Sequence, residues 1–264
     1  SADTLAGLYE AAAPDVVLNA TGFAVSAPGK GFAPGPLDAT GCPVLQVVFS
    51  GGNREGWESS TRGLSARDIA MNVALPEVDG RILARAVSFK SAAARDELTE
   101  TDIVSYRPVQ DRVAFTAQLA ARWVRLRRRP VAERRIGLVV ANYPNRDGRI
   151  GNGVGLDTPA AAASAIGRLR TEGYDCDGAP ENGRDLVDRL LAGPTNDHTA
   201  LAGRVIPVTL PLEAYVRFLD SLEATVREAV TDRWGNPEED SFFLTGDRAF
   251  AISAYVCGKL AIGL

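Results

Sequence analysis

The sequence predicts an α/β fold in which helices flank one or two mostly parallel β-sheets. Short apolar runs rich in β-branched residues are bounded by glycine and proline, as buried parallel strands are. Between these runs lie longer segments whose apolar residues recur at helical spacing. The chain has 264 residues, of which 45% are hydrophobic, so it can bury a full core without disulfides or structural metals.

The first hundred residues alternate predicted helices and strands. Strands are expected at the apolar runs 16–19, 44–49 and 81–90. The Ala-rich stretch 5–13 is expected to be a helix, and Ser65 with Asp68 forms a capping signature for a short helix that Pro76 should end. The charged segment 91–100 is expected to be a surface turn or disordered loop, which closes a first α/β subdomain, residues 1–100.

Residues 101–264 form the second expected α/β subdomain. A helix is predicted from residue 108 to 128, where arginines crowd the last turns and positive charge is favoured by the helix dipole. The clearest buried strand of the sequence is 136–141. Further helices are expected directly after Asp157, at 186–191 and, as one long helix, at 212–230. The alternating tail, 249–262, predicts a C-terminal β-hairpin.

A long glycine-rich loop, residues 143–155, follows the strand at 136–141 and leads to a helix start. Glycine lets the backbone approach a ligand closely, and amides near a helix N-terminus attract anions. The loop lacks both the phosphate-loop ending Gly-Lys-Ser/Thr and the dinucleotide pattern Gly-x-Gly-x-x-Gly, so it gives nucleotide binding little support. The alternative is a connection that uses glycine and asparagine only to turn the chain.

Two further polar segments adjoin predicted strands. Residues 51–57 follow the strand at 44–49 and, in a parallel sheet, would share an edge and a cleft with the glycine-rich loop. The segment 75–80 carries a carboxylate pair, Glu77 and Asp79. These side chains could accept protons or attract a divalent cation, although paired acids at a turn are more often solvated or capping groups.

Composition excludes several classes of protein. The net charge is -4, and the arginine-rich stretch 122–135 has a single aromatic residue, Trp123, rather than the repeated alternation of basic and aromatic residues that favours nucleic-acid binding. No run of eighteen apolar residues and no signal-peptide pattern is present, so a cytoplasmic protein without membrane spans is expected. The single histidine, His198, excludes a site that needs two imidazoles, and it is expected to be a solvated surface residue. The three scattered cysteines are expected to be buried small hydrophobes.

The stretch from Leu138 to Pro159, which includes Asn-Tyr-Pro-Asn-Arg-Asp-Gly-Arg-Ile-Gly-Asn-Gly, closely resembles the large subunits of cobaltochelatase, the CobN-type proteins related to magnesium chelatase H subunits. Earlier blocks resemble the same family in the same order: 43–51 with Arg54, Glu55 and Trp57, then 62–65, 68–73, 75–81 and 88–90. The resemblance spans nearly the whole chain. Because such subunits are several times longer, the chain is expected to be an internal portion of one.

The resemblance implies a role in the aerobic synthesis of cobalamin. In this family Co2+ is a substrate, inserted into the corrin ring of hydrogenobyrinic acid a,c-diamide. Separate AAA+ partner subunits hydrolyse ATP, and the large subunit holds the macrocycle. The implied partners are therefore the AAA+ chelatase subunits, the tetrapyrrole and the remaining domains of the large subunit, with no ATP bound by this chain.

The chemistry of metal insertion selects candidate residues within the matching blocks. Ring nitrogens must lose protons and the hydrated ion must lose water, and a carboxylate can serve both needs. We expect Glu77, at the edge of the sheet predicted to bind ligand, to be the base or metal-handing group, with Asp79 second. Residues that bind the metal itself stay unassigned.

The ring's periphery suggests binding residues by chemical type. Arginine forms planar bidentate contacts with carboxylates, and asparagine matches the ring's amides. The residues expected to bind the substrate are Arg54, Asn142, Asn145, Arg149 and Asn152.

Two alternatives stay open. In a magnesium chelatase H-type subunit the ring would be protoporphyrin, which is flatter and more apolar, whereas the polar loop favours an amidated corrin. In a docking module these lobes would contact the AAA+ subunits and never touch the ring. As a fragment, the isolated chain is expected to fold but to be inactive in metal insertion.

Overall fold

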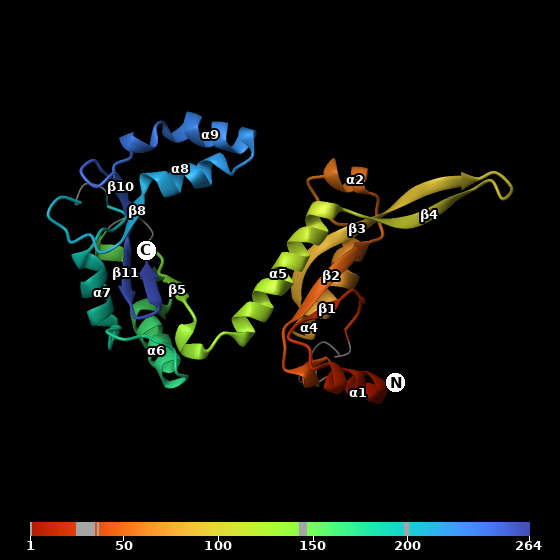
Figure 1. Cartoon of the computed structure of the whole chain (residues 1–264), viewed down its shortest axis with the longest axis horizontal. Coiled ribbons are helices and arrows are strands. Elements are labelled where there is room, and N and C mark those ends of the chain that lie inside the picture. Colours follow the sequence, from red (N-terminus) through yellow and green to blue (C-terminus); the bar gives the residue numbers. More distant parts are fainter. Residues whose placement is uncertain (1, 25–34, 36, 143–146, 198–200) are drawn as a thin grey trace. The chain divides into compact units, whose positions relative to one another are not determined.

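The computed structural model describes residues 2–24, 35, 37–142, 147–197 and 201–264. The chain divides into two compact units, Ser1–Arg128 and Arg129–Leu264 (Figure 1). This boundary differs from the expected one after residue 100, because helix α5 (Gln110–Arg128) belongs to the first unit. Its residues pack on β3, and its Arg112 guanidinium donates to the carbonyl oxygen of Ala86 in that strand.

The first unit is built on a four-stranded sheet of order β1-β2-β3-β4. Strands β1 (Val17–Asn19), β2 (Val44–Ser50) and β3 (Ile82–Asp96) are parallel, and β4 (Thr101–Pro108) is antiparallel to β3. Helix α1 (Ala2–Ala12) precedes β1. The α/β class and the expected strands that correspond to β1, β2 and the first part of β3 are confirmed. β4 was not expected, and it makes the sheet mixed because it runs antiparallel to β3.

The segment expected to be a turn or disordered loop, 91–100, is instead largely strand. β3 continues to Asp96, the chain turns at residues 97–100, and β4 returns beside it in the register Ser91↔Ser105 to Asp96↔Thr101. The charged composition misled the prediction because this ribbon lies outside the packed sheet. The side chains of residues 97–104 are exposed there, so polar residues are compatible with strand structure.

Pro76 does not end the helix that precedes β3. After α2 (Arg54–Glu58), the helical segments α3 (Ala66–Ile69), a π-helical turn (Ala70–Ala74) and α4 (Leu75–Val78) follow without a break. A proline in a helix has no N–H to donate, and its ring crowds the preceding turn. A π turn contains an extra residue and relieves that crowding.

The hydrogen bonds around the π turn show how the proline is accommodated. Leu75 N donates to Ala70 O, five residues earlier, so the next carbonyl in this pattern, Met71 O, would meet the nitrogen of Pro76. Phe23 N donates to Met71 O instead, at 2.8 Å. The approach is so close that a Cβ on Gly22 would lie 2.9 Å from Met71 O, which explains the glycine.

The core of the first unit lies between the sheet and its helices. Its buried members are Val48, Ala86, Phe89 and Val109. Trp57 packs on them with its ring 5.0 Å from that of Phe89, and Arg112 lies 4.6 Å above the Trp57 ring. Helices α2 and α5 are thereby held against β3.

The second unit contains a three-stranded sheet of order β11-β12-β5. β5 (Ile136–Val139) is parallel to β12 (Leu260–Gly263), which forms a hairpin with β11 (Ala254–Cys257). Helices α6 (Thr158–Thr171) and α7 (Gly183–Ala192) pack on one another. The expected strand at 136–141, the two expected helices and a terminal hairpin are therefore confirmed. The hairpin begins at Ala254 and not at the expected residue 249.

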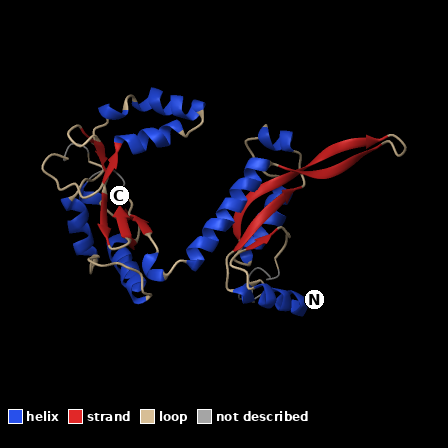
Figure 2. Ribbon diagram, viewed as in Figure 1, coloured by secondary structure: helices blue, strands red, loops and turns tan. Residues whose placement is uncertain are grey.

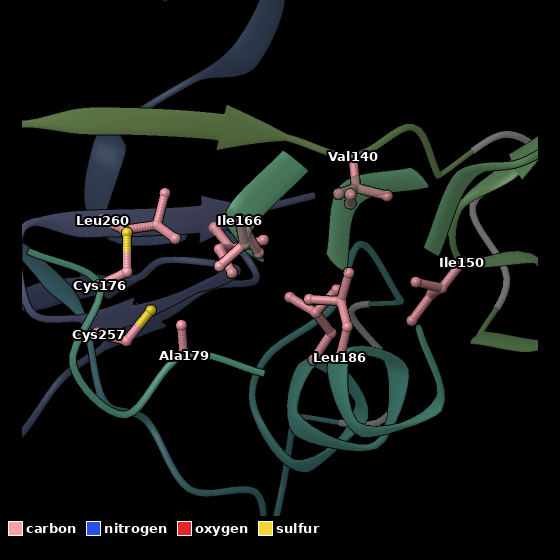
Figure 3. Packing of buried hydrophobic residues seen from close by; sticks show 11 residues of the cluster. Val140, Ile150, Ile166, Cys176, Ala179, Leu186, Cys257 and Leu260 are labelled. Carbon is pink, nitrogen blue, oxygen red and sulfur yellow. The ribbon is translucent and has the colours of Figure 1, made fainter. Parts of the chain in front are cut away.

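The buried cluster of the second unit joins α6, α7 and the sheet (Figure 3). It contains Ile166, Leu186 and Leu260 together with two cysteines, Cys176 and Cys257. Burial raises the pKa of both thiols, so they stay protonated at neutral pH. These two cysteines are buried small hydrophobes, as expected, whereas Cys42 is only partly buried.

The region from 209 to 251 departs from the prediction at two points (Figure 2). The single long helix is two helices, α8 (Leu212–Asp220) and α9 (Ala224–Trp234). The hydroxyl of Ser221 donates to Phe218 O, a local bond that competes with helix continuation. β10 (Ala249–Ala251) lies between β8 (Thr209–Pro211) and β9 (Phe243–Leu244) in a separate antiparallel sheet, so it is not part of the terminal hairpin.

None of the helices among the described residues has the length and apolar character needed to cross a membrane.

We predict opposite effects for two Gly→Ala changes in the paired helices. Gly183→Ala would place a Cβ 2.8 Å from Ala160 N, where α6 and α7 meet, and should lower the free energy of unfolding by about 1–3 kcal/mol. Gly167→Ala, in the exposed interior of α6 with nothing near its Cβ, should raise it by roughly 0.5–1 kcal/mol. Urea denaturation measures the change in the free energy of unfolding of each variant. Equal changes in the two variants would contradict the close approach of α6 and α7 at Gly183.

Candidate functional site

The acidic pair Glu77 and Asp79 lies at the amino end of the parallel strands. The register pairs Leu45 with Ile82 and Ser50 with Phe89, and the acids directly precede Ile82. Residues 51–57 follow the carboxyl end of β2, at the opposite end of the same strands. The expectation that Glu77 shares the carboxyl edge with that loop is therefore wrong, because a segment that enters a strand lies at its amino end.

The two carboxylates have different surroundings. Asp79 is buried, and its Oδ2 atom lies 3.3 Å from Nη2 of Arg81, whose side chain is 9% exposed. Glu77 is exposed and lines a cavity of about 440 Å³ together with Gln46 and Arg81. Asp79 therefore compensates the charge of Arg81, while Glu77 presents its carboxylate to the cavity.

Two buried amides form the wall behind these residues. Asn19 Nδ2 donates to Gln46 Oε1 at 2.6 Å, and Gln46 Nε2 donates to Thr21 O at 3.1 Å. Asn19 lines a second cavity, of about 270 Å³, that also contains Asp79 and Arg81. Arg81 thus lines both cavities. We call Asn19, Gln46, Glu77, Asp79 and Arg81 the amino-edge site.

At the carboxyl end of β2, Arg54 lies at the start of α2 and is exposed. Its Nε atom is 2.7 Å from Glu58 Oε1, and this hydrogen bond raises the pKa of the guanidinium. A cavity of about 580 Å³ next to it is lined by residues that include Trp57, Arg62 and Ser65. Arg54 is not among its lining residues.

Asp68 stabilises the loop at the carboxyl end of β2. From the sequence it was recognised only as part of a helix-capping signature. Its buried carboxylate accepts from Ser50 Oγ at 2.8 Å and from Gly51 N at 3.1 Å, and Asp68 N donates to Ser65 Oγ at 3.1 Å. The capping signature is therefore confirmed. The carboxylate also ties the loop after β2 to α3, a long-range contact that has no signature in the sequence.

In the second unit, Asn142 follows β5 and begins the glycine-rich segment. Its side chain is 8% exposed, and neither amide atom has a hydrogen-bond partner in the part of the chain that the structure describes. A buried amide without partners is unfavourable, so it is a candidate for binding a polar ligand group. Asn145 and His198 lie outside the described residues.

The other predicted loop residues lie on the surface of the second unit. Arg149 is exposed. Asn152 is exposed in β6 (Asn152–Gly153), which pairs with β7 (Leu156–Asp157). Asp157 Oδ1 accepts from Ala160 N at 3.0 Å, which confirms the predicted cap of α6.

Asp147 anchors residues 147–155, the described part of the glycine-rich loop, although no role was predicted for it. Its carboxylate accepts from Thr195 Oγ1 at 2.6 Å and pairs with the Arg204 guanidinium. Arg204 Nη1 also donates to Leu191 O at 2.8 Å, and Gly151 N donates to Ala141 O at 2.8 Å. These bonds join the loop to β5 and to the segment after α7.

The two loops expected to share one sheet edge follow strands of different sheets. Residues 51–57 follow β2 in the first unit, and residues 143–155 follow β5 in the second. A common cleft between them stays a prediction. Among the described residues, no three His, Cys, Asp or Glu side chains are grouped so that they could hold a metal ion.

Comparison with known proteins gives consistent similarities. The family model CobN/Magnesium Chelatase matches residues 2–264. Aerobic cobaltochelatase subunit CobN of Sinorhizobium sp is 52% identical over 264 residues, which are 100% of this chain and 20% of that protein. The CobN subunit of Pseudomonas aeruginosa is 47% identical over 232 residues, 88% of this chain and 18% of that protein.

A solved structure extends the similarity to the fold. The catalytic subunit of cobaltochelatase from Mycobacterium tuberculosis matches with a TM-score of 0.74 and 30% identity, over 97% of this chain and 22% of that one. The chain thus spans about a fifth of the length of these relatives.

We predict that two equally buried asparagines respond differently to replacement by leucine. Asn142→Leu should leave the free energy of unfolding unchanged or raise it by up to about 2 kcal/mol, because it removes a buried amide that has no partner among the described residues. Asn19, also 8% exposed, is bonded, and Asn19→Leu should lower the free energy of unfolding by about 1–3 kcal/mol, because it leaves the Gln46 Oε1 atom without its donor. Urea denaturation tests the pair, and a similar loss in both variants would show that the Asn142 amide is bonded.

Proposed function

The chain belongs to the CobN/magnesium chelatase family, and on this premise we propose that it forms part of the large, tetrapyrrole-binding subunit of an ATP-dependent cobaltochelatase. The reaction is insertion of Co2+ into hydrogenobyrinic acid a,c-diamide in aerobic cobalamin biosynthesis, with ATP hydrolysed by AAA+ partner subunits. The observation that carries the choice of ring is the 52% identity to a CobN subunit over the whole chain, against 26% to 28% for magnesium chelatase H subunits.

In this proposal the amino-edge site contributes the proton or metal transfer. Glu77 acts as the base or metal-handing group, because its carboxylate is exposed to a cavity and forms no ion pair with the residues that the structure describes. A hard oxygen ligand of this kind can replace a water of the hydrated ion. Asp79 is better suited to fixing Arg81, since its buried carboxylate forms an ion pair with that guanidinium.

The glycine-rich loop contributes contacts to the periphery of the ring. An amide substituent of a corrin can both donate to and accept from Asn142, whose own amide lacks partners among the described residues. The exposed guanidinium of Arg149 suits a ring carboxylate, and Asn152 and Asn145 suit further amides. Arg54 can bind a ring carboxylate only if its ion pair with Glu58 breaks. Breaking an exposed ion pair of this kind costs little free energy.

The magnesium chelatase alternative rests on relatives that match a smaller part of the chain. The H subunit of Rhodobacter capsulatus is 26% identical over 64% of this chain. Because the chain spans about a fifth of the CobN subunits, we further propose that it inserts no cobalt alone, since an open partial site cannot exclude water or distort the ring.

We predict that the full-length subunit binds the corrin acid at least about tenfold more tightly than protoporphyrin. The polar loop offers partners for the amides and the several carboxylates of the corrin acid. Protoporphyrin has only two carboxylates. Difference absorbance on titration with each ring gives both dissociation constants. Tighter binding of protoporphyrin would assign the subunit to magnesium chelation instead.

A second prediction concerns Glu77 in the assembled complex. Glu77→Gln keeps the shape but removes the proton acceptor and the charge, so cobalt insertion should fall by about 100-fold with an unchanged melting temperature. Asp79→Asn should reduce turnover less and lower the melting temperature more, because it disrupts the buried pair with Arg81. Steady-state insertion assays and thermal unfolding separate the two effects. Normal turnover in the Gln variant would leave Glu77 as a turn residue.

A further inference from the structure

Strands β3 and β4 extend beyond the four-stranded sheet as a two-stranded ribbon, residues 91–105, which we call the hairpin arm (Figure 1). β2 pairs with β3 only as far as Phe89, and Lys90 N still donates to Gly52 O. From Ser91 onward the two strands pair only with each other among the described strands. An isolated two-stranded ribbon is marginally stable in water, so the arm is expected to have a further contact.

Both faces of the hairpin arm carry aliphatic side chains exposed to solvent. Ile103 and Val104 are adjacent in β4, and each is more than half exposed. Adjacent residues of a strand point to opposite faces. The described residues of the first unit therefore cover neither face completely.

The tip of the arm presents a single leucine on an ordered turn. Leu98 is 97% exposed. Asp96 Oδ1 accepts from Leu98 N at 2.9 Å and from Thr99 N at 3.3 Å, and the Thr99 and Thr101 hydroxyls are 2.8 Å apart. Because these bonds fix the turn, docking of Leu98 requires little further ordering of the backbone.

The tip is also strongly acidic. Residues 95–102 contain a single basic residue, Arg95, and four acidic residues, Asp96, Glu97, Glu100 and Asp102. The Arg95 Nη1 atom lies 4.0 Å from Oδ1 of Asp102. A complementary surface would place basic side chains around an apolar pocket.

We propose that the hairpin arm docks Leu98 into an apolar pocket, rimmed by lysine or arginine, on another part of the same large-subunit polypeptide. The chain spans 20% of a CobN relative, so most of that polypeptide lies outside these residues. Aliphatic groups on both faces need permanent cover, which a covalently linked domain supplies better than a transient partner. The inference rests on family membership and not on the metal or ring.

A photo-crosslinking amino acid in place of Leu98, in the full-length subunit, tests the proposal. Irradiation should join position 98 to a peptide of the same polypeptide outside these 264 residues. The crosslink is intramolecular, so the product should keep the mass of a single polypeptide. The same substitution at Leu8 in α1, which is 60% exposed, should give at least about fivefold less product. A crosslink to a separate polypeptide, whether an ATPase subunit or a second copy, would overturn the proposal, as would no crosslink.

Charge reversal at the tip tests the basic rim. Glu97→Lys together with Glu100→Lys should lower the yield from position 98 at least about fivefold, whereas Glu10→Lys, in α1, should leave it unchanged. An undiminished yield in the double variant would exclude a basic rim. Corrin binding is measured on the same preparations, so a subunit that crosslinks as expected but binds no ring would refute only the proposed function.

Discussion

The parallel pairing of β2 with β3 is the constraint on which the first unit depends. Parallel neighbours require a crossover: the chain leaves β2 at its carboxyl end and must return to the amino end of β3. That crossover contains α2, α3, the π turn and α4, and it supplies both the Asp68 anchor and the acidic pair. The separation of Glu77 from Arg54 by the length of the strands therefore follows from topology. Two distinct polar regions exist in this unit for the same reason.

The π turn joins this crossover to the loop after β1. Because Pro76 cannot bond to Met71 O, that carbonyl is open to Phe23 N, and Gly22 allows the approach. The same loop carries Thr21, which bonds to Asn19 and Gln46 behind the amino-edge site. A proline that alters the hydrogen bonding of one helix thus contributes to the position of a cavity wall that is distant in the sequence.

Local signals in the sequence identified most elements, and long-range contacts account for what they missed. Buried apolar runs gave β2 and β5, and cap residues gave the starts of α3 and α6, since both depend on neighbouring residues. The hairpin arm was missed because exposed strands need no apolar pattern. Candidate site residues were chosen by chemical type, which cannot show that Asp79 is bound to Arg81 or that Asp68 and Asp147 anchor loops.

Residues 147–155, the described part of the glycine-rich loop, are anchored by bonds from Asp147 to Thr195 and Arg204 and from Gly151 to Ala141. Loop closure lowers the conformational entropy of a chain, and here that loss occurs during folding. A guest molecule that meets these residues therefore encounters main-chain amides already fixed in direction. Its affinity reflects the quality of the contacts more than the cost of organising the segment that makes them.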